Sequence, residues 1–218
     1  GGDADLTFIS DGKINIQDSI QSTSGKLNVT AKAKNHVQFL QCEVVSGGGA
    51  TTCGSGEEPG RATNMSIKTN GGDIVLWSNS ANATSSATTH DIYIGDGATF
   101  ESAGGKIILA GGEDTNPADG YPDGYAYIGG DYGEYPGFEG GGGRAADSEL
   151  EPPAISLGSL NSMDGDRITF TSAGGDIILR GHSGRNNANG SSGIQTQRQL
   201  AIDSGSGTIL IDGKKTAD

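Results

Sequence analysis

The segments Thr99-Phe-Glu-Ser-Ala-Gly-Gly-Lys-Ile-Ile-Leu109 and Thr169-Phe-Thr-Ser-Ala-Gly-Gly-Asp-Ile-Ile-Leu179 agree at nine of eleven positions and begin 70 residues apart. Each places a small glycine-rich turn between two runs in which apolar and polar residues alternate. A period of two predicts half-buried β-strands, and the glycines supply the positive φ of the corner between them. A strand–turn–strand unit that recurs along a chain is typical of a solenoid.

Weaker copies of this unit occur elsewhere, at residues 8–16, 25–29, 67–76 and 202–210. A third short apolar segment precedes some units, at residues 92–95, 126–129 and 155–158. The glycine pairs that end at Gly72 and Gly105 lie 33 residues apart, which sets the expected length of one rung. We therefore expect the 70-residue interval between Gly105 and Gly175 to equal two rungs.

These features predict an all-β fold, a single-stranded parallel β-helix with three short strands per rung and long corner loops. Successive rungs should stack about 4.8 Å apart, with Ile, Leu, Val and Phe in columns inside the coil, Ile107 and Ile177 among them. The alternative is an antiparallel sandwich with tight hairpins at Asp11-Gly12, Asn70-Gly71 and Asp96-Gly97. That alternative leaves the regular spacing unexplained.

Composition also fits a solenoid better than an ordinary globular core. Only 33% of the residues are hydrophobic and 6% aromatic, while 39 of the 218 are glycine. A solenoid needs only one short apolar stripe per strand, and the sustained apolar alternation argues against disorder. We expect one β-helix domain over residues 1–218, as a segment of a longer rod, with loops at about 42–64, 78–89, 111–153 and 181–193.

The charge balance limits the classes of partner. A net charge of −13 argues against binding nucleic acid, whose phosphates attract Lys and Arg, and against anionic membrane surfaces. No apolar run approaches the roughly 20 residues that span a bilayer, so membrane insertion is not expected. The chain opens without a signal peptide, as expected for a mature or excised piece.

The two cysteines, Cys42 and Cys53, are separated by ten residues. They are consistent with one short-loop disulfide formed in an oxidising compartment. The alternative is a pair of buried free thiols. A zinc site is not expected, because two ligands without nearby histidines do not complete a tetrahedron.

The corner motifs resemble those of the filamentous haemagglutinin-like adhesins, which are bacterial exoproteins of the two-partner secretion type. The likeness lies in Gly-Gly-Asp-Ile-Val-Leu at 71–76, Gly-Gly-Lys-Ile-Ile-Leu at 104–109 and Gly-Gly-Asp-Ile-Ile-Leu at 174–179, and it covers about two-thirds of the chain, the large loops excluded. The resemblance implies a right-handed β-helix exported to the cell surface or medium. The family's secretion domain has no counterpart in these residues, so the likeness is to the passenger segment.

Five tyrosines fall within fifteen residues of the longest loop, at positions 121, 125, 127, 132 and 135. Tyrosine combines a flat apolar face with a hydroxyl, which suits stacking on sugars or docking a protein. Tyr121, Tyr125, Tyr132 and Tyr135 are therefore candidate ligand-binding residues. The alternative is that the rings fold back onto the flank of the β-helix and fix a glycine-rich loop.

The same loop carries a candidate calcium site. Asp114, Asn116, Asp119 and Asp123 loosely match the spacing of a calcium-binding loop, which supplies hard oxygen ligands from a flexible turn. The match lacks a closing bidentate Glu at the proper position. The alternative is a solvated acidic loop, and no other cofactor is expected.

An enzyme is not expected. Catalysis on a β-helix needs carboxylates, or an acid with Arg or Lys, that converge on one face. Asp11, Asp73, Asp96 and Asp176 fall in turns and are expected to point outward, and Lys106 replaces the Asp of the other copies. The three histidines, His36, His90 and His182, are scattered and are expected at the surface.

The sequence therefore predicts an extracellular structural or adhesive rod on the surface of a bacterium, which mediates adhesion or biofilm cohesion through its loops. The expected partners are glycans or proteins on host or neighbouring cells. A first alternative is a subunit that stacks end to end with copies of itself into a surface fibre. A second is a carbohydrate-active β-helix enzyme.

Overall fold

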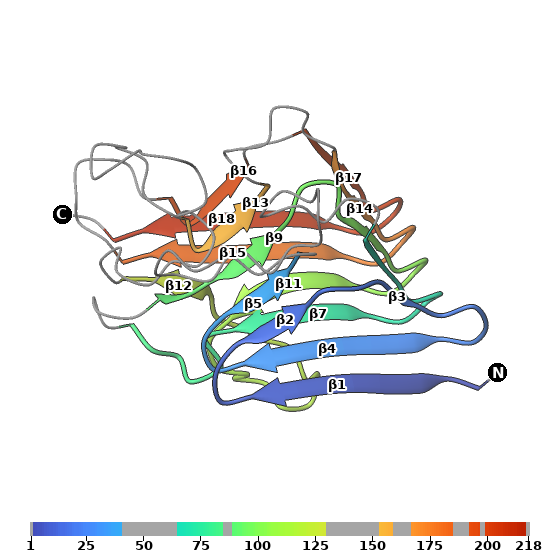
Figure 1. Cartoon of the computed structure of the whole chain (residues 1–218), viewed down its shortest axis with the longest axis horizontal. Helices are drawn as coiled ribbons and strands as arrows, with labels where there is room; N and C mark the ends of the chain where they lie inside the picture. The colour runs from blue at the N-terminus through green and yellow to red at the C-terminus, as the bar shows by residue number, and fades with distance from the viewer. Residues whose placement is uncertain are drawn as a thin grey trace, which may run out of the picture.

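The computed structural model describes residues 2–40, 65–84, 89–129, 153–158, 167–184, 192–196 and 199–216. Within these ranges all regular structure is β-strand, and the strands form three sheets (Figure 1). We call them sheets A, B and C. No helix capable of crossing a membrane occurs in the described part of the chain.

Sheet A contains the longest strands, which lie side by side in Figure 1. They are β1 (Ala4–Ser10), β4 (Leu27–Ala33), β7 (Ile74–Ser78), β11 (Ile107–Gly111), β15 (Ile177–Ser183) and β18 (Ile209–Lys215), with the short β8 (Thr89–His90) and β12 (Ala126–Ile128). Sheet B contains β2 (Ile14–Ile16), β5 (Val37–Phe39), β9 (Ile92–Ile94), β13 (Ile155–Leu157) and β16 (Ile194–Thr196). Sheet C contains β3 (Ile20–Gln21), β6 (Ser66–Lys68), β10 (Thr99–Glu101), β14 (Ile168–Thr171) and β17 (Leu200–Asp203).

The chain visits sheets A, B and C in turn, and each complete turn is one rung. Strands of successive rungs pair in parallel, for example β4 with β7 in sheet A, β5 with β9 in sheet B and β6 with β10 in sheet C. Among the described strands, only β8 and β12 pair antiparallel. The predicted parallel β-helix with three strands per rung is therefore confirmed, and the antiparallel sandwich is wrong.

One expectation about rung length is also wrong. Ile107 of β11 pairs directly with Ile177 of β15, so the 70-residue interval is one rung and not two. Likewise Ile92 pairs with Ile155 in sheet B, while Ala126 belongs to sheet A, where it lies opposite Gly181. The reason is that corner insertions lengthen the chain without altering which strands stack, so sequence distance does not count rungs.

Aliphatic and aromatic side chains form the predicted inner columns. Ile74, Ile107 and Ile177 follow one another in register in sheet A, and all three are fully buried. The ring of Phe100 lies between those of Phe39 and Phe170, with centroid separations of 5.1 and 5.0 Å. Because each rung is too thin to bury its own apolar face, these columns bind the rungs into one core.

A hydroxyl closes the corner between sheets C and A in four successive rungs. Each Ser or Thr donates to the carbonyl of the glycine three residues later. The pairs are Thr69 to Gly72 at 2.5 Å, Ser102 to Gly105 at 2.5 Å, Ser172 to Gly175 at 2.5 Å and Ser204 to Gly207 at 2.7 Å. The residue after the hydroxyl has positive φ at Asn70, Ala103, Ala173 and Gly205. A Ser or Thr three residues before a glycine therefore encodes this corner.

A second polar column links neighbouring rungs just beyond the corner. Asn28 Oδ1 accepts from the Asp73 amide at 3.0 Å, and Asp73 Oδ1 accepts from the Lys106 amide at 2.7 Å. Asp176 Oδ1 accepts from the Thr208 amide at 2.9 Å. An oxygen-bearing side chain at this position thus ties its rung to the next one.

The last glycine of each corner lies against the backbone of the preceding rung. A Cβ on Gly105 would come within 2.1 Å of the Gly72 carbonyl oxygen, and one on Gly175 within 1.9 Å of that of Gly105. Real Cβ atoms do not approach so closely, and the obstructing atoms are backbone. Only glycine fits in this column.

We expect Gly105→Ala to lower the free energy of unfolding by about 3 kcal/mol, because the rungs on either side must separate to admit the methyl group. The control is Gly12→Ala, since the nearest heavy atom to a Cβ at Gly12 is Ser10 Oγ at 3.8 Å; its effect should stay within about 0.5 kcal/mol. Urea denaturation followed by circular dichroism measures both. Equal stability of the two variants would contradict this account of the corner.

Candidate functional site

The loop between β11 and β12, residues 112–125, lies on the outer face of sheet A, and we call it the tyrosine loop. Its two ends meet in an antiparallel bridge between Gly111 and Gly124. The Asp123 amide also donates to the Glu113 carbonyl at 3.1 Å. The loop therefore leaves and rejoins the sheet at one place, as expected for a compact surface loop.

Beneath the loop, apolar side chains project from the outer face of sheet A. Val75, Trp77, Ile108 and Ala110 form a buried cluster separate from the main core, with Tyr121 and Ile178 packed against it. Trp77 is only 3% exposed, and its Nε1 donates to the Gly112 carbonyl at 2.7 Å. Without the loop this apolar face would be exposed to solvent, so the loop and the cluster shield one another from water.

Tyr121 attaches the loop beside this cluster, at the start of β7. Its hydroxyl donates to Asp73 Oδ2 at 2.5 Å, and Lys106 Nζ lies 4.8 Å from the ring centroid. Burial, followed by the hydrogen bond to Asp73, raises the pKa of Tyr121, so the hydroxyl stays protonated as a donor. Asp73 therefore accepts two hydrogen bonds, one from the backbone of the next rung through Oδ1 and one from the tyrosine loop through Oδ2.

Tyr125 attaches the other end of the loop to the last strand of the sheet. Its hydroxyl donates to Asp212 Oδ2 on β18 at 2.6 Å, and Lys214 Nζ lies 4.0 Å from the ring centroid. Arg180 on β15 donates to the Asp123 carbonyl at 3.1 Å. The contacts of the tyrosine loop thus run from β7 across β11 and β15 to β18.

The sequence left open whether the tyrosines bind a ligand or fold back onto the rod. Tyr121 and Tyr125 fold back, and so does Tyr127, which is buried and donates to the Thr84 carbonyl at 2.8 Å. Tyr132 and Tyr135 lie outside the described residues. A ligand-binding role for these residues remains a prediction, but the rings of Tyr121 and Tyr125 already have partners within the chain.

The four candidate calcium ligands lie in the same loop but are occupied by local hydrogen bonds. Asp114 accepts from the Asn116 amide at 3.0 Å, and Asn116 Nδ2 donates to Asp119 at 2.9 Å. Asp123 accepts from the Thr115 amide and hydroxyl at 2.9 and 2.6 Å, and these bonds lower its pKa. No group of three or more His, Cys, Asp or Glu in the described part could hold a metal ion.

We expect calcium to leave the thermal unfolding midpoint of the protein unchanged. Binding would require the carboxylates of Asp119 and Asp123 to exchange their N–H and O–H donors for the cation. Calorimetric scans with calcium chloride and with EDTA test this. A higher midpoint in calcium that Asp119→Asn abolishes would show that the loop rearranges into a calcium site.

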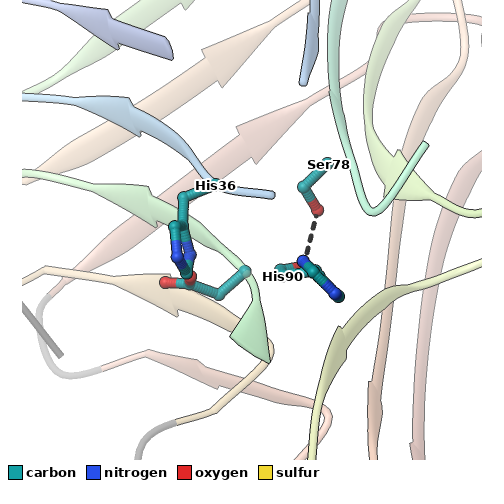
Figure 2. A network of polar contacts seen from close by, with 4 residues as sticks. His36, Ser78 and His90 are labelled. Atoms are coloured by element: carbon teal, nitrogen blue, oxygen red, sulfur yellow. Dashed lines mark hydrogen bonds and ion pairs between the residues drawn. The ribbon is translucent and has the colours of Figure 1, made fainter. Parts of the chain in front are cut away.

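A second polar cluster lies at the corner between sheets A and B (Figure 2). His36, just before β5, contacts Asp91 through Nδ1 and Oδ1, and the rings of His36 and His90 have centroids 6.5 Å apart. The expectation that His90 lies at the surface is wrong, since it is 8% exposed, and Asp96, expected to point outward, is fully buried. Sequence reasoning missed this cluster because its members come from adjacent rungs, 55 residues apart.

The cluster does not form a nucleophile with its base. Ser78 Oγ lies near His90, but it donates to the backbone carbonyl of His90 at 2.9 Å and not to the ring (Figure 2). The carboxylate of Asp91 is paired with His36 and not with His90. This arrangement positions the corner; it does not activate Ser78 for attack.

Cys42 and Cys53 lie outside the described residues, so their pairing stays a prediction. Comparison with protein-family models, with curated proteins and with solved structures found no match to this chain. What the chain does must therefore be inferred from its own contacts. Among the described residues outside the core, the tyrosine loop makes contacts that run from β7 to β18.

We expect Tyr121→Phe and Tyr125→Phe each to lower the free energy of unfolding by about 1 kcal/mol, because each removes one hydrogen bond to a carboxylate while the ring remains. The double variant should lose the sum, since the two hydroxyls bind carboxylates on different strands. Chemical denaturation measures these values. No loss in either variant would mean that both hydroxyls are as well solvated by water as by Asp73 and Asp212.

Proposed function

We propose that this chain is a structural and adhesive segment of an extracellular rod on a bacterial surface. The single observation that carries the structural part is the tyrosine loop, whose contacts run along the rod from β7 to β18. The resemblance of the corner motifs to surface adhesins supports the location and the adhesive part. Contacts to glycans or proteins on other cells would come from loops outside the stacked sheets.

A β-helix pulled along its axis carries load through the hydrogen bonds between rungs. These bonds run parallel to the axis, so rungs separate at the weakest interface. Side-chain links that skip from one rung to another add strength in the same direction. Tyr121 bonded to Asp73 and Tyr125 bonded to Asp212 place such links at both ends of one loop. This geometry suits a protein that resists pulling.

The fibre alternative has one observation in its favour. The large exposed apolar side chains in the described part all lie on β1 and β18, the two outermost long strands of sheet A; they are Phe8, Ile9, Ile209, Leu210 and Ile211. The resemblance of the corner motifs, however, is to surface adhesins, and the tyrosine loop provides contacts along the rod and not at its ends. The adhesive segment is therefore the better supported proposal.

Beads coated with the full chain should adhere to bacterial or epithelial cells several-fold more than beads coated with albumin. Periodate treatment of the cells would abolish this adhesion if the partner is a glycan, and protease treatment would abolish it if the partner is a protein. Adhesion no greater than that of albumin on every cell type would refute the adhesive part of the proposal.

The structural part has a separate test. We expect the full chain, held at its two termini in optical tweezers, to rupture at a lower force when Tyr121 and Tyr125 are both replaced by Phe. The matched control is Lys68→Gln, which removes only an exposed ion pair with Glu101 on sheet C. Equal rupture forces for the tyrosine variant and the wild type would show that the loop carries no load.

A further inference from the structure

His90 is a buried imidazole without a hydrogen-bond partner. It ends β8, where the chain turns from sheet A toward sheet B, and it is 8% exposed. Neither Nδ1 nor Nε2 has a hydrogen-bond partner, while most buried polar groups in proteins have one. Nothing in the corner or in the tyrosine loop explains why a histidine occupies this position.

Two basic side chains and one acidic side chain lie near this imidazole. His36 lies on the neighbouring rung, and its Nδ1 contacts Asp91, which is itself buried. Lys34 lies on the same corner as His36. Burial is the main cause that lowers the pKa of His90, with smaller contributions from His36 and Lys34, while Asp91 opposes them.

The backbone around His90 holds two structural elements together. The carbonyl oxygen of His90 accepts a hydrogen bond from the hydroxyl of Ser78 at the end of β7. In the antiparallel pair of β8 and β12, His90 lies opposite Tyr127, and the ring of Tyr127 contacts His182 on β15. Burial raises the pKa of Tyr127, so its phenol stays neutral in acid. A charge on His90 would therefore disturb both the corner and the β8–β12 pair.

We propose that His90 is an acid-sensitive latch, and that its protonation separates β8 from β12 and loosens the corner between sheets A and B. The imidazolium would need an acceptor, but the carboxylate of the next residue in the chain, Asp91, already contacts His36. His36 and Lys34 both disfavour a charge on His90. The inference goes beyond the proposed function, because it concerns the conditions under which the rod loosens.

The direction of the pH effect follows from linkage. A folded-state pKa below 6.5 means that the unfolded chain binds a proton more readily than the folded chain. The stabilising contribution of neutral His90 is therefore full above about pH 6.5 and is lost as the pH falls below that value. Tyr127 does not titrate in this range, because burial raises its pKa further.

Hydrogen–deuterium exchange of the full chain at about pH 7.5 and about pH 5, corrected for intrinsic exchange, tests the latch. We expect peptides that cover β8, β9 and β12 to lose at least about tenfold in protection at the lower pH, while those of β10 and β14 lose less. His90→Gln should abolish this difference. His182→Gln separates the two histidines, because burial also lowers the pKa of His182 and its ring contacts Tyr127 of β12. A pH difference that His182→Gln abolishes and His90→Gln leaves intact would assign the effect to His182 and overturn the proposal.

A second variant keeps the test decisive if His90→Gln folds poorly by circular dichroism. His36→Gln removes one of the groups that lower the pKa of His90, so the loss of protection between the two pH values should be smaller. Unchanged protection of β8 and β12 in the wild type at about pH 5, or a loss that persists in His90→Gln, would overturn the proposal.

Discussion

The structure depends on the close backbone contact at the corner between sheets C and A. Gly72, Gly105, Gly175 and Gly207 stack in one column there, and each lies too near the carbonyl of the rung before it for any side chain. The hydroxyls of Thr69, Ser102, Ser172 and Ser204 close the same corner by donating to those glycines. Because the corner fixes where each sheet A strand begins, it also fixes the register of the inner columns.

This dependence explains what the sequence could predict. The Ser-Ala-Gly-Gly copies identify the corner, and alternation around Ile107 and Ile177 identifies the buried face, so the parallel β-helix follows from local chemistry. The rung count does not follow, because the interval from Ile107 to Ile177 includes an insertion whose length is unrelated to strand pairing. The number of residues between two strands therefore does not give the number of rungs between them; only the strand pairing does.

The candidate site was only partly predictable for the same reason. The cluster of tyrosines marks a loop with a special role, but the choice between binding and self-packing depends on partners that are remote in sequence. Asp73 precedes Tyr121 by 48 residues and Asp212 follows Tyr125 by 87. His36 and Asp91 are likewise brought together only by stacking. A single sequence shows which residues are present in each rung, but not which residues of other rungs lie beside them.

Lys106 has a consequence for the rod as a whole. At this position Asn28, Asp73 and Asp176 each supply an oxygen to the amide of the next rung, but a lysine side chain has only donors and cannot do so. The boundary between β11 and β15 therefore lacks this side-chain hydrogen bond. Arg180 on β15 donates to the tyrosine loop, and Tyr125 of that loop bonds to Asp212 on β18, so the loop bridges, from outside, the boundary where the bond within the sheet is missing.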